Sequence, residues 1–251
     1  MSAKVIVCIP ARYESTRFPA KILACQTGKY LIQHSYEQAL KAKLPAKVLI
    51  ATDDERIMVA AAEFGASCVM TRSDHQSGTD RIAEAMAQKE MARQEADIVV
   101  NLQGDEPEID PAHIDMVANL LIQHHDVPMA TLACPLQNGN QVANPNIVKV
   151  ITDTKGCALY FSRSVIPYDR DASGPGKAAN YLRHIGLYAY RLAFLQTITQ
   201  QPQTPLEKME KLEQLRVLEH GYRIQVGRVA HCCDGIDTPE QYQAFVERLR
   251  N

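Results

Sequence analysis

Short apolar runs alternate with helical patterns through the first half of this 251-residue chain. The runs are rich in valine, isoleucine and leucine and too short for core helices, and they lie at 5–9, 47–52, 68–70 and 97–102. Between them, apolar residues recur at helical spacing over 30–42, 53–64 and 80–88. Strands and helices in this order need right-handed crossovers. We therefore predict an α/β fold, with a mainly parallel Rossmann-like sheet flanked by helices.

The pattern changes after residue 138. Two apolar runs, 147–151 and 158–161, flank the turn residues 153–156, which predicts a β-hairpin. Further along, the pattern predicts a strand over 184–190, one long helix over 205–220 and a last strand over 223–229. The length fits one domain. We therefore expect a single domain, 1–251, with a hairpin-containing insertion around 140–190.

Net charge and cysteine content limit the partners and the compartment. A net charge of -2 gives no overall field that would recruit nucleic acid or an anionic membrane. The first apolar run ends at Pro10, so we expect neither a signal peptide nor a membrane span. The seven cysteines form no C-x-x-C pair, and even Cys232 and Cys233 lack zinc spacing. Together these features predict reduced thiols in a cytoplasmic protein.

A basic loop follows the first predicted strand, which Pro10 is expected to end because it lacks a backbone donor. Arg12, Arg17 and Lys21 share this loop with one acidic residue, Glu14. Ligands of open α/β sheets bind at the carboxyl edge of the strands, where such cations suit phosphate groups. The loop contains neither a Walker A motif nor G-x-G-x-x-G, so side chains would have to hold the phosphates. The alternative is an ordinary solvated basic loop.

Two isolated aspartates are candidate ligands for a hard cation. Asp105 follows the fourth predicted strand, where Gly104 allows the backbone to turn, and Asp237 precedes the terminal helix. Magnesium is usually bound by one or two carboxylates together with substrate phosphates. The alternatives are a turn aspartate at 105 and a helix cap at 237. With the basic loop, the pair favours nucleotidyl transfer, and the residues by themselves leave the base and the sugar open.

Other polar side chains could contact a ligand. The loop 71–81 could contact a base edge, or could simply be well capped by Ser77 or Thr79. On the strand 184–190, period-two alternation places His184, Tyr188 and Tyr190 on one face. Residues 167–176 form a Pro/Asp/Gly-rich loop that we expect to be mobile.

The chain resembles the 3-deoxy-manno-octulosonate cytidylyltransferase family over essentially its whole length. The matching segments occur in one order, at 9–19, 70–79, 101–107, 158–163, 183–188, 212–216 and 236–240. The chain departs from the family pattern at Ala20 and Ile22, where the family usually has glycine and proline. Ala20 therefore predicts a stiffer loop.

The resemblance implies transfer of CMP from CTP to the anomeric hydroxyl of 3-deoxy-D-manno-octulosonate (Kdo) in lipopolysaccharide biosynthesis. It also implies a Mg²⁺ requirement and a homodimer that forms through the insertion around 140–190, which would also bind the sugar. The alternatives are an enzyme for a related acid sugar (8-amino-Kdo or a sialic acid) and a nucleotide-binding regulator without turnover.

The resemblance also assigns roles to residues. The catalytic residues would be Arg12, Lys21, Asp105 and Asp237, of which Asp105 and Asp237 would bind the metal. The nucleotide would be bound by Pro10, Ala11, Arg12, Arg17, Lys21, Arg72, Ser77 and Gly78. The sugar would be bound by Gln103, Arg163, His184, Tyr188, Glu213 and Gln214.

Overall fold

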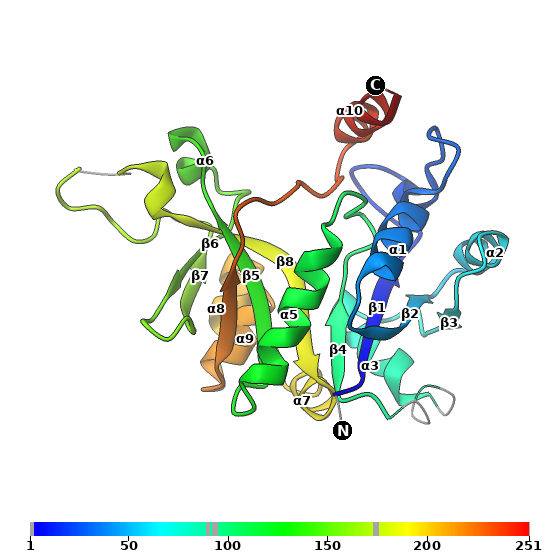
Figure 1. Cartoon of the computed structure of the whole chain (residues 1–251), viewed down its shortest axis with the longest axis horizontal. Coiled ribbons are helices and arrows are strands. Elements are labelled where there is room, and N and C mark those ends of the chain that lie inside the picture. The colour runs from blue at the N-terminus through cyan, green and yellow to red at the C-terminus, as the bar shows by residue number, and fades with distance from the viewer. Residues whose placement is uncertain (1–2, 89–90, 92–94, 173–175, 251) are drawn as a thin grey trace. The chain divides into compact units, whose positions relative to one another are not determined.

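The structure is a computed structural model that describes residues 3–88, 91, 95–172 and 176–250 (Figure 1). It divides into two compact units, Met1–Asp115 with Cys233–Asn251, and Met116–Cys232. The insertion expected around 140–190 lies within the second unit. Of the loop 167–176, residues 173–175 lie outside the described residues.

The first unit contains a parallel sheet in the order β3-β2-β1-β4. Its strands are β1 (Val5–Ala11), β2 (Pro45–Thr52), β3 (Cys68–Met70) and β4 (Ile98–Asn101). β1 and β4 are buried along their whole length, which explains their continuous apolar sequence. These strands confirm the sequence prediction.

Helices pack against this sheet, α1 on β2, α2 on β3 and α3 on β1. Their bounds are α1 (Leu31–Lys41), α2 (Glu55–Glu63) and α3 (Gly78–Ala87), and the unit ends with α10 (Pro239–Arg250). Side-chain caps start two of them: Asp54 accepts a hydrogen bond from the Arg56 amide, and Ser77 accepts one from the Asp80 amide. A short 3₁₀ helix, η1 (Lys21–Leu23), follows the basic loop. The strand–helix alternation of the sequence therefore gives the predicted α/β class.

Contrary to the prediction, β1 does not end at Pro10. Pro10 pairs with Ala51 of β2, and the strand continues to Ala11. The Cys8 carbonyl accepts from the Leu102 amide, so the missing amide of Pro10, two residues on, faces the side of β4. The β1–β4 register ends at Cys8, so the proline costs no ladder hydrogen bond there.

The second unit contains a mixed sheet. β5 (Met129–Pro135) pairs antiparallel with β8 (Leu182–Arg191) and parallel with β9 (Ile224–Arg228). The predicted hairpin is confirmed as β6 (Lys149–Thr152) and β7 (Ala158–Ser162), and β6 also pairs antiparallel with β8. The remaining elements are α5 (Pro111–Gln123), which starts in the first unit, α6 (Gly139–Ala143), η2 (Ala178–Asn180), α7 (Leu192–Ile198), α8 (Pro205–Glu210) and α9 (Gln214–Glu219).

The single long helix predicted over 205–220 is wrong. Lys211 adopts a left-handed conformation (φ 55°), which ends α8 before α9 begins at Gln214. A buried ion pair connects the two short helices, with Arg216 Nη2 2.6 Å from Glu207 Oε1. Met209, an apolar residue near the end of α8, is exposed.

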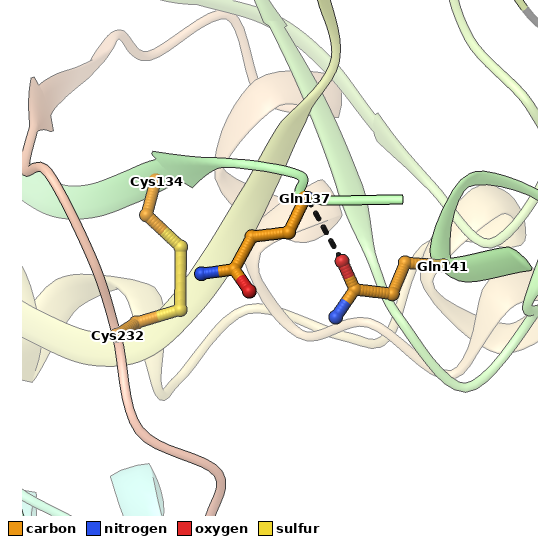
Figure 2. The surroundings of a disulfide bond; sticks show 4 residues. All are labelled: Cys134, Gln137, Gln141 and Cys232. Carbon is orange, nitrogen blue, oxygen red and sulfur yellow. Dashed lines mark hydrogen bonds between the residues drawn. A yellow bond between two sulfur atoms is a disulfide. The ribbon is translucent and has the colours of Figure 1, made fainter. Parts of the chain in front are cut away.

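Two of the thiols predicted to be reduced form a disulfide. Cys134, near the end of β5, is bonded to Cys232, which lies beyond β9 (Figure 2). The two cysteines are separated by 98 residues, so no local sequence pattern predicts that they pair. The other cysteines are free thiols, among them the exposed Cys233.

Among the described residues, no helix is both long and apolar enough to cross a membrane.

Candidate active site

A nearly buried lysine lies between two carboxylates in the first unit. Lys21 Nζ is 2.6 Å from Asp105 Oδ2 and 3.1 Å from Asp237 Oδ1, and only 9% of its side chain is exposed. The two aspartate side chains are more open, at 27% and 44%. The structure therefore brings together three of the predicted catalytic residues from three distant parts of the sequence.

The C-terminal segment is fixed in place by packing and by backbone hydrogen bonds. The Ile236 amide donates to the Asp105 carbonyl (2.9 Å), which joins the two aspartate loops directly. Ile236, Tyr242 and Phe245 are buried against Leu31 of α1. Full burial of such a side chain contributes roughly 1.5–3 kcal/mol, enough to hold Asp237 beside Lys21.

The basic loop contributes further cations. Arg17 Nη2 lies 2.9 Å from Asp237 Oδ1 while most of its side chain remains exposed. Arg12 is also exposed. Between them in sequence, the Tyr13 ring stacks under the Arg56 guanidinium, with Cζ 3.3 Å from the ring centroid. An exposed arginine that shares Asp237 with the buried Lys21 is suited to binding a flexible polyanion. The described contacts do not connect Arg12 with this cluster.

Three of the motifs picked out in the sequence meet around Pro10. A Cβ atom at Gly78, the first residue of α3, would lie 3.1 Å from Pro10 Cγ. A Cβ at Gly104 would lie 3.1 Å from Ile22 Cδ1 and 3.5 Å from the Pro10 carbonyl oxygen. The buried Ser35 hydroxyl donates to the Gly104 carbonyl (2.9 Å), which fixes that turn before Asp105. A side chain at 104 would therefore crowd Ile22, which gives this glycine a packing role in addition to the turn suggested by the sequence.

The remaining predicted residues of the first unit form local contacts. Ser77 Oγ caps α3, as the sequence allowed. Arg72 is exposed, and its amide donates to Glu84 Oε1 (3.1 Å). Burial pushes the pKa of Glu84 upward, but hydrogen bonds from His75 and from the Arg72 amide outweigh burial and lower the pKa. Gln103 Nε2 donates to Asn101 Oδ1 (3.0 Å). The roles predicted for Arg72, Ser77 and Gln103 stay predictions.

The second unit holds the other predicted sugar residues. His184 and Tyr188 have ring centroids 5.4 Å apart, and Tyr190 follows at 6.1 Å from Tyr188. Burial, followed by the positive charge of Arg183, lowers the pKa of His184 to about 3, so the ring is neutral at pH 7. Burial, followed by the charge of Glu213, raises the pKa of Tyr188, so the phenol keeps its proton.

Gln214, at the first turn of α9, faces this aromatic group. Tyr188 Oη donates weakly to Gln214 Oε1 (3.4 Å). Gln214 is buried, and its Nε2 has no hydrogen-bond partner among the described residues. A buried amide without a partner is costly, and this cost is commonly tolerated where a ligand completes the hydrogen bonds. Its burial shows that Gln214 is not an ordinary solvated surface residue.

Arg163 is held in a network of main-chain contacts. Its Nε donates to the Glu210 carbonyl (2.7 Å) and its Nη1 to the Pro145 carbonyl (3.0 Å). The buried Lys149 Nζ donates to the carbonyl of Arg163 (2.6 Å). Burial is the main cause that lowers the pKa of Lys149. Nε and Nη1 of the guanidinium therefore bind main-chain carbonyls, and Nη2 has no hydrogen-bond partner within the described residues.

The family of this chain follows from comparisons with known proteins. A family model described as Cytidylyltransferase matches residues 6–224. A 3-deoxy-manno-octulosonate cytidylyltransferase of Solibacter usitatus is 47% identical over 99% of this chain and 95% of the relative. One of Idiomarina loihiensis is 48% identical over 94% of this chain and 95% of the relative. This chain belongs to the 3-deoxy-manno-octulosonate cytidylyltransferase family. It is a nucleotidyltransferase enzyme.

Solved structures agree with membership in the cytidylyltransferase family. A CMP:2-keto-3-deoxy-manno-octonic acid synthetase complexed with CTP superposes with a TM-score of 0.90 at 42% identity, covering 99% of both chains. A cytidylyltransferase of Leptospira borgpetersenii, at 18% identity and a TM-score of 0.61, shares the fold. The resemblance noted in the sequence and the predicted fold class are therefore both confirmed.

In this cytidylyltransferase, residues that the sequence did not reveal support the predicted site residues. Lys149 and Glu210 hold Arg163, whose amide donates to Glu210 Oε2 (3.0 Å). Lys149 is the one charged residue in an otherwise apolar run, and this was the one sequence feature that could have indicated its supporting role. Thr131, beside His184, has no such signal, because a threonine in a strand is ordinary.

Proposed function

We propose that this protein transfers the cytidylyl group of CTP to the anomeric hydroxyl of Kdo, giving CMP-Kdo and pyrophosphate for lipopolysaccharide biosynthesis. The observation that carries the proposal is the Lys21 ammonium held between Asp105 and Asp237. It places a fixed cation and two oxygen-rich ligands at the end of β4, where ligands of α/β sheets bind. The names and high coverage of the relatives support Kdo as the acceptor.

The reaction is a displacement at the α-phosphorus. The anomeric oxygen forms a bond to phosphorus, the bond from phosphorus to the oxygen shared with the β-phosphate breaks, and the hydroxyl proton is released. Negative charge accumulates on the departing pyrophosphate. Lys21, Arg17 and Arg12 would stabilise that charge, and Lys21 needs little reorganisation because its side chain is already fixed.

The cofactor we propose is Mg²⁺, held by Asp105 and Asp237. The donor set fits, since both residues offer carboxylate oxygens and both already bind one cation, the Lys21 ammonium. When bound, a magnesium ion would neutralise phosphate charge and orient the triphosphate. The chain's own part is to keep the two carboxylates close together through the Ile236–Asp105 hydrogen bond.

Residues of the second unit would bind the sugar. The free Nη2 side of Arg163 suits the sugar carboxylate, because a guanidinium binds carboxylates strongly. The neutral His184 ring and the unpaired Gln214 amide suit sugar hydroxyls. Glu213 completes the proposed set in this unit. Gln103, a residue of the first unit, stays a proposed sugar ligand.

The proposal also covers the compartment and the assembly. CTP as a substrate supports a cytoplasmic enzyme. Two large side chains of the insertion, Leu159 and Tyr168, are 60% and 68% exposed, which supports a homodimer that covers them. Light scattering of the purified protein tests the dimer.

The experiment that tests the proposed activity measures pyrophosphate release from CTP and Mg²⁺ with Kdo, 8-amino-Kdo and a sialic acid in parallel. We expect the highest kcat/KM with Kdo and a CMP-Kdo product by mass spectrometry. A higher kcat/KM with another acid sugar would reassign the acceptor. CTP binding without pyrophosphate release from any sugar would indicate a regulator.

A further inference from the structure

A bulge in β8 brings His184 and Tyr188 together. Thr131 of β5 pairs with Tyr188, but the next residue, Leu132, pairs with Ile185, so the register skips Gly186 and Leu187. In a regular strand, four residues span about 13 Å. The ring centroids of His184 and Tyr188 are only 5.4 Å apart. The pairing of these two rings therefore depends on the bulge.

The Thr131 hydroxyl lies at the centre of this bulge. Its Oγ1 is 3.1 Å from the Ile185 carbonyl oxygen and 2.9 Å from the Leu187 carbonyl oxygen. The same atom is 3.1 Å from His184 Nε2. Thr131 is fully buried, so water does not compete for these contacts.

The single proton of the hydroxyl decides the direction of these hydrogen bonds. A carbonyl oxygen only accepts, so the hydroxyl proton must point toward Ile185 or Leu187. If it pointed toward His184, lone pairs of Oγ1 would face two carbonyl oxygens within about 3.1 Å. Oγ1 therefore accepts from His184 Nε2–H. Because burial keeps the ring neutral, Nδ1 carries a lone pair and no proton.

We propose that Thr131 is a positioning residue for the acid sugar: its hydroxyl holds the β8 bulge and fixes His184 as the Nε2–H tautomer, so that Nδ1 accepts a hydrogen bond from a sugar hydroxyl. This inference rests on the proposed function only for the identity of the sugar. The bulge and the tautomer are properties of the free protein. Among the described residues, Nδ1 of His184 has no hydrogen-bond partner within the protein, so it is available to a ligand.

The first test reads the tautomer directly. Long-range ¹H–¹⁵N correlation spectra of ¹⁵N-histidine-labelled protein distinguish the protonated ring nitrogen, and His184→Gln assigns the signal by its disappearance. We expect a neutral ring protonated at Nε2 in the free enzyme at pH 7. A proton on Nδ1 would overturn the proposal, whatever the activity.

The second test compares variants of Thr131. Thr131→Val keeps the shape and removes the hydroxyl, so we expect a mixed tautomer and an increase of about tenfold in KM for Kdo, equal to about 1.4 kcal/mol. The KM for CTP should not change. Thr131→Ser keeps the hydroxyl and should retain the Nε2–H tautomer and a KM for Kdo near that of the parent enzyme.

A matched control separates this role from general destabilisation. Thr152 is a half-buried strand threonine of the same unit, whose Oγ1 accepts from Arg228 (3.2 Å). Thr152→Val should leave both KM values and the His184 spectrum unchanged.

An unchanged KM for Kdo in folded Thr131→Val would contradict the proposal. If Thr131→Val fails to fold, the tautomer of the parent protein and of Thr131→Ser decides. Absence of Kdo turnover would refute the proposed substrate. If His184 of that protein still carried its proton on Nε2, the role of Thr131 in orienting the ring would stand.

Discussion

Lys21 Nζ donates to Asp105 Oδ2 over 2.6 Å, although the two residues are 84 positions apart. The contact joins the 3₁₀ helix after the basic loop to the turn after β4. Since the lysine is nearly buried and the aspartate is partly open, the pair leaves carboxylate oxygen accessible while its charge is balanced. In such an arrangement the Asp105 carboxylate can exchange the Lys21 ammonium for another cation.

Loss of the Asp105 charge should remove most turnover. We expect Asp105→Asn to fold normally and to lose a factor of about 10² to 10³ in kcat at saturating Mg²⁺, because a charge that organises the transition state is gone. Steady-state kinetics with circular dichroism check this. Asp97→Asn is a matched control, since Asp97 lies before β4 and caps the Lys4 amide (2.7 Å). Near-parental kinetics in Asp105→Asn would remove Asp105 from the catalytic set.

Glycine at position 20 should stabilise the protein. Ala20 has φ 54° and ψ 24°, a left-handed conformation that costs an L-residue about 1–2 kcal/mol. Part of the gain is offset by the greater freedom of glycine in the unfolded chain, so we expect Ala20→Gly to add about 0.5–1 kcal/mol. Urea unfolding measures it.

Ala24→Gly is the comparison, because Ala24 has φ -60° and ψ 127°, where alanine is unstrained. That variant should lose stability. Equal losses in both variants would show that Ala20 is not strained.

Arg163→Lys should weaken binding of the sugar specifically. The guanidinium holds the Glu210 and Pro145 carbonyls at 2.7 and 3.0 Å while offering Nη2 to a carboxylate, and an ammonium cannot do both. A charged hydrogen bond contributes roughly 1.5–3 kcal/mol, so KM for Kdo should rise about ten- to a hundredfold with KM for CTP nearly unchanged. Kinetics with each substrate varied in turn decide it.

Arg223→Lys is a suitable control, since Arg223 pairs with the exposed Asp126 (2.6 Å). An effect of Arg163→Lys confined to CTP would move Arg163 from the sugar to the phosphates.

The buried His184 should make stability fall in mild acid. Burial lowers its pKa in the folded protein from 6.5 to about 3, so below pH 6.5 the unfolded chain takes up a proton that the folded chain does not. Stability is therefore retained above pH 6.5 and lost progressively toward pH 3, by about 2 kcal/mol between pH 7 and pH 5. Urea unfolding of the parent and of His184→Gln at both pH values should show this difference. The same pH dependence in both proteins would contradict a neutral buried ring.

Reduction of the Cys134–Cys232 disulfide should lower stability and spare turnover. Closing a loop with a separation of 98 residues restricts the unfolded chain, so reduction should cost about 2–4 kcal/mol. Turnover should persist with Mg²⁺ as the only added metal, because neither cysteine belongs to the proposed catalytic set. Denatured, unreduced protein should titrate as five thiols and reduced protein as seven. Seven thiols before reduction, or activity that depends on added zinc, would refute this account.

Local chemistry in the sequence predicted the strands of the first unit, the hairpin over β6 and β7, and the cap at Ser77. The sequence predictions failed where the surroundings of a residue in the fold override its local conformational preference. Pro10 continues β1 because β4 has already ended beside it, and Lys211 breaks a helix that the apolar pattern favours. The separation of His184 and Tyr188 by four residues predicted one shared face, but their contact required the bulge.

The sequence by itself determined which residue types are available at the carboxyl ends of the strands, because period-two and helical patterns place loops reliably. It therefore identified Lys21, Asp105 and Asp237 as candidates. Only the tertiary structure decided that one ammonium bridges both carboxylates, that Thr131 orients His184, and that Cys134 meets Cys232. The physical reason is that these contacts join residues far apart in the chain, whose distances depend on the packing of whole elements. No local pattern encodes such a distance.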